Sequence, residues 1–405
     1  MQFIQNYRLN EIGGIRNDLK EVVNLKKIFA AGVIMSILSV LLSLCARKVT
    51  GFAQAYSVTI YPVLKGIFAR IFGIFPFSVS EVGLYLLLLL CIFSVVKWFK
   101  TPLYLLNGAF FTASLLFFLF TINCGINYYR NSFSYEAGFV IRTHSTDELY
   151  ALCSDLVNKV NENIPTETSP SPSDAGNFSY FQNFSYLREM GKGGQKAMKG
   201  LADEYPQFKS WYPYPKPLIH PRLLSVQQLT GVYSPVTVEA NYNSEIPAYN
   251  IPHTICHELS HLKGYMREDE ANFIGYLACT GSESRSFRYS GYLTGWVYAG
   301  NALAKADYDG FIELYKKLDE KARNDLEENN VFWDRFEGKT AEVSTKVNDT
   351  YLKAHSQTDG VLSYGRMVDL MLADFYLYAT FLGSVVGGVV NCVINYGWGN
   401  CSISV

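Results

Sequence analysis

The sequence lacks a cysteine framework. Of its eight cysteines, Cys45 and Cys91 lie in long apolar runs, Cys124 lies near the end of another, and no two form a C-x-x-C pair. The five further along the chain are odd in number and have no paired spacing. These absences argue against a disulfide-stapled domain and a thiolate zinc site. Cys256, beside the motif described below, is expected to be a small buried thiol.

The sequence also lacks an excess of either charge, with 35 Lys and Arg against 36 Asp and Glu in 405 residues. The balance hides an asymmetry, because residues 1–129 carry 11 basic and 4 acidic residues and the remainder carries 24 and 32. An acidic larger part argues against nucleic acid as a partner. Residues 1–27 have no small-residue cleavage site of a removable signal peptide.

Charge is scarce in three long stretches near the N-terminus. Ile28–Ala46 and Leu103–Ile122 contain none, and Phe77–Val96 contains only Glu81 near its edge. Each stretch is long enough to cross a hydrocarbon core of about 30 Å. The sequence therefore predicts three transmembrane helices, at about 28–46, 77–96 and 103–122, within a membrane region of residues 1–127. Buried helices of a large soluble protein are the alternative.

Basic residues near these stretches predict the orientation. With the N-terminus inside, seven lie in cytoplasmic segments and four in the first outer loop: Arg8, Arg16, Lys20, Lys26, Lys27, Lys97 and Lys100 against Arg47, Lys48, Lys65 and Arg70. This bias favours a cytoplasmic N-terminus and, after three crossings, an extracellular remainder. We therefore expect a multi-pass protein of the cell membrane, with the lipid bilayer as one partner.

The strongest chemical signal is the stretch His257-Glu258-Leu259-Ser260-His261. Two histidines four residues apart lie one helical turn above each other, at the separation that two ligands of a tetrahedral Zn²⁺ need. Glu258 lies where it can take a proton from water activated by the metal. Zn²⁺ is therefore the expected cofactor, and a surface helix with two ordinary histidines is the alternative.

The residues around this motif fit a helix with one buried face. Ile255, Leu259 and Leu262 lie almost opposite the two histidines, so one side can enter a core while the other faces a metal. Pro252 fits the first turn and Gly264 fits the end.

A second helix is expected over residues 268–279, with Glu268, Asp269 and Glu270 in its first turn, where the helix dipole favours acids in any case. The residues on the face of Glu268 are small or polar: Ala271, Asn272, Gly275 and Ala278. The residues on the face of Glu270 are large: Phe273, Ile274 and Leu277. A ligand needs the face that approaches the motif helix closely. Glu268 is therefore the predicted third metal ligand, and Glu270 is the alternative.

The rest of the outer part, residues 128–378, reads as one mostly helical domain. Ser145 or Thr146 should cap its first helix, and further helices are expected over 292–305, 311–328, 340–355 and 364–378. Residues 379–405 form an apolar C-terminal tail that packs on the domain or membrane, with a fourth crossing as the alternative.

A short sheet is expected just before the motif helix. Residues 232–238 favour one or two strands, and Pro235 confines them to an edge. In zinc peptidases an edge strand typically lines the cleft and pairs with an extended substrate, whereas a plain structural hairpin is the alternative.

The motif and the second helix together resemble the gluzincin zinc metallopeptidases, in which H-E-x-x-H is followed by a Glu ligand and, four residues later, usually Asp. In this chain Asn272 stands at that Asp position. Its hydrogen bond to His257 or His261 behind the metal would therefore be neutral rather than anionic.

Nearly the whole chain looks like a bacterial family of membrane-anchored H-E-x-x-H proteins that is classed as a domain of unknown function. Besides the three apolar helices, these stretches carry the likeness: Thr230–Tyr233, Glu239–Asn241, His253–Leu259, Arg267–Asn272 and Ser363–Arg366.

The resemblance implies a mostly α membrane protein with three N-terminal transmembrane helices and an α+β, zincin-like domain with a short edge sheet. It implies a zinc metallopeptidase that cleaves peptide or protein substrates at the outer face of the membrane, with Glu258 as the base. Three downstream residues lie where related enzymes keep a donor for the tetrahedral intermediate: His355, Tyr364 and Arg366. A non-catalytic sensor or assembly module, or a zinc hydrolase of cell-envelope material, is the alternative.

The charge bias makes the orientation testable. An alkaline phosphatase fused after Tyr128 is expected to be active outside the membrane, and a fluorescent protein fused after Lys100 is expected to fluoresce in the cytoplasm. The exchanged fusions serve as controls and should both be silent. The reverse pattern would place the metal motif inside the cell.

Overall fold

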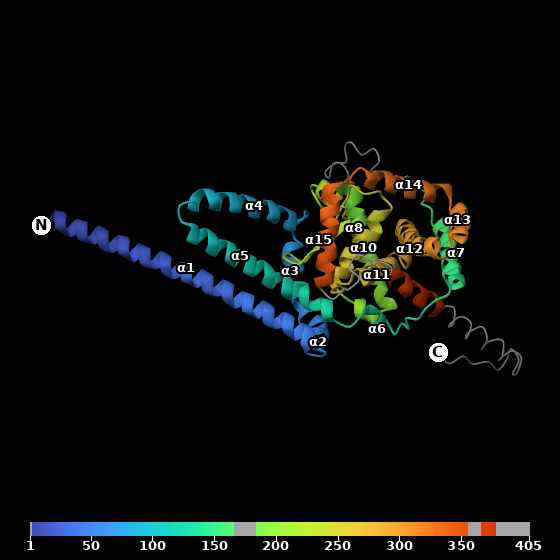
Figure 1. The fold of residues 1–405 in the computed structure, drawn as a ribbon, viewed down its shortest axis with the longest axis horizontal. Helices are drawn as coiled ribbons and strands as arrows, with labels where there is room; N and C mark the ends of the chain where they lie inside the picture. The colour runs from blue at the N-terminus through green and yellow to red at the C-terminus, as the bar shows by residue number, and fades with distance from the viewer. Residues whose placement is uncertain (1, 166–183, 355–365, 378–405) are drawn as a thin grey trace, which may run out of the picture. The chain divides into compact units, whose positions relative to one another are not determined.

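The computed structural model describes residues 2–165, 184–354 and 366–377, and it is mostly helical (Figure 1). The chain divides into two compact units. Unit 1 consists of Met1–Arg130 with Tyr233–Glu239, and unit 2 consists of Asn131–Val232 with Ala240–Val405. His355, Tyr364 and the predicted tail at 379–405 lie outside the described residues.

Unit 1 contains three long helices, two short ones and a 3₁₀ turn: α1 (Gln2–Lys48), α2 (Phe52–Thr59), α3 (Tyr61–Phe72), α4 (Val79–Trp98), α5 (Pro102–Asn123) and η1 (Gly125–Tyr129). Asn24–Lys48 of α1, α4 and α5 are long and apolar enough to cross a membrane, which agrees with the three predicted helices. α4 begins two residues later than predicted because Ser78 caps it, accepting a hydrogen bond from the Glu81 backbone N–H at 3.1 Å.

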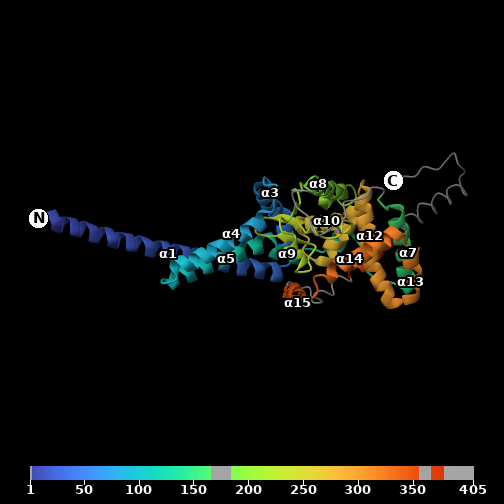
Figure 2. The same ribbon diagram turned by 90° about the horizontal axis from the view of Figure 1, so that it is seen from above.

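Small and polar residues hold α1 and α5 together, and the two helices run side by side in both views (Figures 1 and 2). Ser36 donates a hydrogen bond to Ser114 at 2.9 Å, and the Asn107 amide donates to the Leu25 carbonyl at 2.9 Å. Such bonds join helices in lipid, where apolar contact alone gives little drive for association. Most of the exposed side chains of α4 are large and apolar, as lipid-facing side chains are: Leu84, Leu86, Leu88, Leu89, Leu90, Ile92, Phe93, Val95 and Val96.

The segment Tyr233–Glu239 belongs to unit 1 through hydrogen bonds with three of its helices. The Tyr233 hydroxyl lies 3.2 Å from the Tyr61 hydroxyl of α3 and donates to the Asn123 carbonyl of α5 at 3.0 Å. The Glu239 carboxylate accepts from the first two backbone N–H groups of α4, at 3.1 and 2.8 Å. These N–H groups have no partner within their own helix, so Glu239 caps α4 from a distant part of the chain.

Unit 2 holds the remaining helices: α6 (Phe133–Ala137), α7 (Thr146–Glu162), α8 (Phe184–Gly200), α9 (Arg222–Ser225), α10 (Asn250–Lys263), α11 (Glu268–Thr280), α12 (Arg285–Ala306), α13 (Tyr308–Lys317), α14 (Glu320–Asp334), α15 (Lys339–Ala354) and a helix over 366–377. The predicted cap at Ser145 is confirmed, with a complete capping box to Glu148. The single helix predicted over 311–328 is wrong, because α13 ends at Lys317 and Asp319 caps α14 by accepting from the Lys321 N–H.

A three-stranded sheet has the order β1 (Lys216–Pro217), β3 (Glu239–Tyr242), β2 (Gly231–Ser234). β1 runs parallel to β3, with Lys216 opposite Asn241. The expected strand residues 236–238 lie instead in the turn after Pro235, where Val238 has a positive φ of 55°. β2 is an edge strand of this sheet, as Pro235 predicted.

Helix α10 lies at the centre of unit 2, packed against α8, α11 and α12 (Figure 1). Its Ile255, Leu259 and Leu262 are each 0 % exposed. Glycine allows the close packing, since a Cβ on Gly194 of α8 would lie 2.2 Å from the Ile255 Cγ2 atom. α10 ends as predicted at Gly264, which has a φ of 103° and donates from its N–H to the last turn.

The positive φ of Gly264 predicts that replacing this glycine costs more stability than replacing Gly200. Gly264→Ala is expected to lower the free energy of unfolding by about 1 kcal/mol, because a Cβ is disfavoured at positive φ. Gly200→Ala, at the end of α8, is the matched control: Gly200 has a φ of −60° and open space around its Cα. Chemical unfolding of the full chain in detergent measures both, and equal losses would contradict the assignment.

Candidate metal centre

Helices α10 and α11 bring three ligand-type side chains together. The Nε2 atoms of His257 and His261 lie 3.3 and 3.6 Å from the two carboxylate oxygens of Glu268. One ligand atom from each residue lies within 4.8 Å of the others. Ligands of tetrahedral zinc, each about 2.0 to 2.2 Å from the metal, are roughly 3.3 Å apart. The three side chains therefore have the spacing of a zinc ligand set.

Hydrogen bonds on the far side of each imidazole fix which nitrogen faces the cluster. His257 Nδ1 lies 2.9 Å from the Asn272 side-chain oxygen, and His261 Nδ1 lies 2.8 Å from the Tyr265 carbonyl. Both oxygens are acceptors, so each Nδ1 carries the hydrogen and donates it. The Nε2 lone pairs are left for the cluster, which is the arrangement that metal-binding histidines normally have.

Two backbone features make this geometry possible. Gly275 lets α11 approach α10, since a Cβ there would lie 3.2 Å from both the His253 ring and the His257 backbone nitrogen. The left-handed turn at Gly264 reverses the chain after α10, so that the Tyr265 N–H bonds to the Ser260 carbonyl. The Tyr265 carbonyl then lies beside His261.

Burial and charge oppose each other at the cluster. Burial lowers the pKa of His257, but the hydrogen bond and charge of Glu268 outweigh it and leave that pKa raised. For His261 burial wins over the attraction of Glu268, and the pKa falls to about 4. Burial raises the pKa of Glu268, yet His261 and His257 together leave it lowered. The carboxylate is thus stabilised in its ionised form, the form in which it binds a metal.

Glu258 interacts electrostatically with His257 and Glu268 but is not one of the three ligands. Its side chain is buried, and its Oε2 atom has no hydrogen-bond partner among the described residues. Burial, opposed by the charge of His257, raises the pKa of Glu258 to about 8. A buried carboxylate oxygen without a partner is costly, and in native proteins it commonly faces water, an ion or a ligand.

The edge strand β2 passes directly against Glu258. A Cβ on Gly231 would lie 2.5 Å from the Glu258 Oε1 atom, so a larger residue at this point of the strand would have to displace the Glu258 side chain. The sequence placed Gly231 in a stretch that resembles the family but gave it no role. A glycine directly before the predicted strand residues was the available signal.

The two acids next to Glu268, Asp269 and Glu270, contact other residues instead of the histidines. The Glu270 carboxylate accepts a hydrogen bond from the Phe133 N–H at 3.1 Å and lies 3.4 Å from Arg267. Asp269 accepts from Arg366 Nε at 3.0 Å. The geometry therefore favours Glu268 over Glu270 as the third ligand.

Of the three residues considered as donors to the tetrahedral intermediate, His355 and Tyr364 lie outside the described residues. Arg366 contacts Asp269, and its role in catalysis stays a prediction. The sequence did not single out Tyr298 of α12, whose pKa is raised by burial and by the charge of Glu268. It also missed the Tyr265 carbonyl, because any residue supplies such a group and only the Gly264 turn hints at it.

The residues present fit a zinc ion. Two imidazoles and one carboxylate form the three-ligand set of catalytic zinc sites, which keep a further position open. The three side chains retain 13, 10 and 18 % exposure for His257, His261 and Glu268, so the cluster is accessible. His257, His261 and Glu268 would hold the metal, and the Glu258 carboxylate is close enough to interact electrostatically with two of them, His257 and Glu268.

Replacing Glu268 by Gln is expected to weaken zinc retention at least tenfold, because loss of a charged ligand should exceed the 10 to 100-fold typical of residues behind the ligands. Glu270→Gln is the control, since an amide oxygen can still accept the Phe133 N–H. Zinc content of the full chain after graded chelation measures both. Loss of zinc from Glu270→Gln alone would reverse the assignment.

Comparison with protein-family models gives a match. The family model described as Protein of unknown function (DUF3810) matches residues 56–372, which is more than half of the chain and includes the whole metal cluster. No match was found among curated proteins or among solved structures. The membership expected from the sequence is thus confirmed, whereas the likeness to gluzincins stays a prediction. The chain belongs to the family described as Protein of unknown function (DUF3810).

Proposed function

We propose that this chain is a membrane-anchored zinc metallopeptidase that hydrolyses peptide bonds at the outer face of the cell membrane. The observation that carries the proposal is the pairing of a three-ligand cluster with a separate buried carboxylate, Glu258, whose Oε2 atom has no hydrogen-bond partner among the described residues. A site that only binds metal has no need of this fourth group. The zincin-like character of unit 2 is part of the same proposal.

When bound, zinc supplies Lewis-acid polarisation of the scissile carbonyl. The chain supplies the rest. Glu258 takes a proton from the attacking water and passes it to the leaving amine, which general acid–base catalysis requires of one group in turn. Asn272 and the Tyr265 carbonyl hold the two imidazoles in the tautomer that offers Nε2, so the ligands need no rearrangement.

The edge strand supports a peptide as the substrate. Among the strands that the structure describes, β2 is at the edge of the sheet, and its first residue, Gly231, lies against Glu258. An extended peptide that paired with β2 would gain main-chain hydrogen bonds while its backbone ran beside the base. This arrangement favours peptides over compact ligands.

The location of the activity follows from the apolar helices and the basic residues around them. Three helices of suitable length anchor the chain. With the N-terminus in the cytoplasm, the positive-inside rule puts the metal motif on the outer side. Proteins and peptides of the cell envelope are then the accessible substrates.

Glu258→Gln is the decisive variant. It is expected to keep zinc at wild-type stoichiometry and to lower the rate of peptide cleavage about 10² to 10⁴-fold, because a neutral amide cannot accept the water's proton. Full-length protein in detergent is incubated with a mixed peptide library, with and without chelator, and products are identified by mass spectrometry.

Glu283→Gln is the matched control, because Glu283 forms an exposed ion pair with Lys196 and should not affect cleavage. Unchanged cleavage by Glu258→Gln would remove Glu258 as the base. If wild-type protein binds zinc but cleaves no peptide, the chain is a non-catalytic binding module, or it acts on another envelope polymer.

A further inference from the structure

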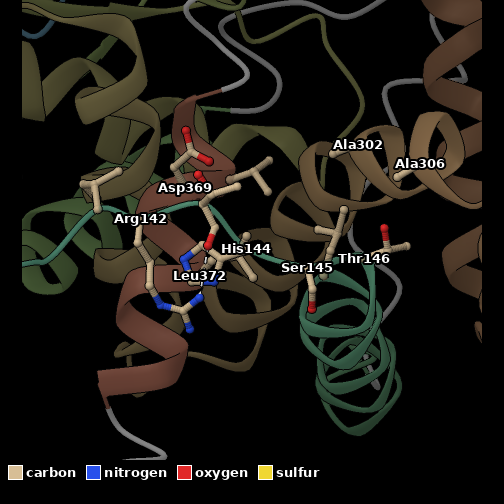
Figure 3. Close-up of a pocket in the computed structure, with 12 residues that line it drawn as sticks. Arg142, His144, Ser145, Thr146, Ala302, Ala306, Asp369 and Leu372 are labelled. Atoms are coloured by element: carbon tan, nitrogen blue, oxygen red, sulfur yellow. Dashed lines mark hydrogen bonds between the residues drawn. The ribbon is translucent and has the colours of Figure 1, made fainter.

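Unit 2 contains a cavity that is separate from the metal cluster and has a volume of about 630 Å³. Its walls are residues 141–146, which lead into α7, together with Ala302 and Ala306 of α12 and Asp369 and Leu372 of the 366–377 helix (Figure 3). Pockets for small molecules commonly have this size and combine an apolar lining with a few polar groups. The metal cluster contributes no residue to it.

A buried histidine in this lining has unused hydrogen-bonding capacity. The His144 side chain is only 4 % exposed, and neither ring nitrogen has a hydrogen-bond partner among the described residues. The ring stacks on Tyr376 with centroids 5.8 Å apart, and its Nδ1 lies 3.5 Å from a Glu148 oxygen. An imidazole that is held in place but not satisfied points to a ligand group as its partner.

The charges around the cavity leave one carboxylate in excess. Arg142 makes two contacts with Glu148, at 2.5 and 3.1 Å, and Arg366 Nε donates to Asp269 at 3.0 Å. Asp369 forms no hydrogen bond or ion pair in the described part of the chain, and burial raises its pKa. Both arginines already contact a carboxylate, so an anionic ligand would have to displace one of these carboxylates from its arginine. A cation could pair with Asp369 without breaking either contact.

Metal coordination does not fit this arrangement as well as an organic cation does. In the described ranges, the only convergent group of three metal-ligating side chains is His257, His261 and Glu268. His144, Glu148 and Asp369 do not converge in that way. The cavity also offers apolar surface that a bare ion would not use: Ile141, Leu149, Ala302, Ala306, Val368 and Leu372.

We propose that this cavity binds a small organic ammonium ion with an apolar substituent. The ammonium group pairs with Asp369 and donates a second hydrogen bond to a ring nitrogen of His144, while the substituent packs between Ala302 and Leu372. The inference is independent of the metal centre and of the proposed peptidase activity.

The test uses hexylammonium, with hexanoate and hexanol as probes of matched length and different charge. Binding to the full chain in detergent is measured by isothermal titration calorimetry. Hexylammonium is expected to bind most tightly, and Asp369→Asn is expected to weaken it at least about tenfold, the effect of losing a charge-assisted hydrogen bond. Asp309→Asn, on the exposed face of α13, should bind like the wild type.

Two further variants keep the test decisive if Asp369→Asn fails to fold. His144→Phe keeps the ring beside Tyr376 but removes both nitrogens, and is expected to weaken binding several-fold. Ala302→Phe fills the cavity and should abolish binding of all three probes. Zinc content should stay unchanged in every variant. Equal binding of hexanoate, no binding of hexylammonium, or wild-type affinity in folded Asp369→Asn or His144→Phe would overturn the proposal.

Discussion

The close approach of α10 and α11 is the constraint on which the candidate centre depends. Glu268 reaches the two histidines because Gly275, about two turns further along the same face of α11, has no side chain to hold the helices apart. The same approach brings the Asn272 oxygen to His257, so the ligand and the group that orients its partner come from one helix face. A Cβ at this contact would lie 3.2 Å from the His257 backbone nitrogen, so a larger residue would require α10 and α11 to move apart slightly.

The site also concentrates buried polar groups that need one another. His253, one turn before the motif, lies with its Nε2 atom 3.1 Å from the Asn272 backbone carbonyl, and burial lowers the pKa of His253 to about 4. The neutral ring therefore fills space beside α11 without adding charge near the ligands. Cys256 and Cys279 are both fully buried and free, which agrees with the structural role expected for Cys256.

Local patterns predicted most of the fold because their physical causes are local. Uncharged runs, the Ser145 cap and the Gly264 stop each act within a few residues, and their elements begin or end within about two residues of the expected positions. The spacing of His257 and His261 and the small face around Glu268 likewise depend on helix geometry alone.

Contacts between distant segments could not be predicted in this way. The sequence gives no sign that Gly231 would lie against Glu258, that Arg366 would bond to Asp269, or that Glu270 would accept the Phe133 N–H. The break at Asp319 was missed for another reason. The apolar residues before and after Asp319 keep the spacing of one continuous helix face, which predicts a single helix. The structure instead has a new helix that Asp319 caps.

The hairpin segment Tyr233–Glu239 has a consequence for the order of folding. It completes unit 1, yet Tyr61 and Tyr233 are separated by 172 residues, and Val79 and Glu239 by 160. During synthesis, the first two backbone N–H groups of α4 must wait for Glu239 while the Asn131–Val232 part of unit 2 emerges. Loop closure over such lengths is slow. The apolar helices therefore reach their final packing late. By then the ribosome has made the Asn131–Val232 part of unit 2, the unit that carries the metal motif.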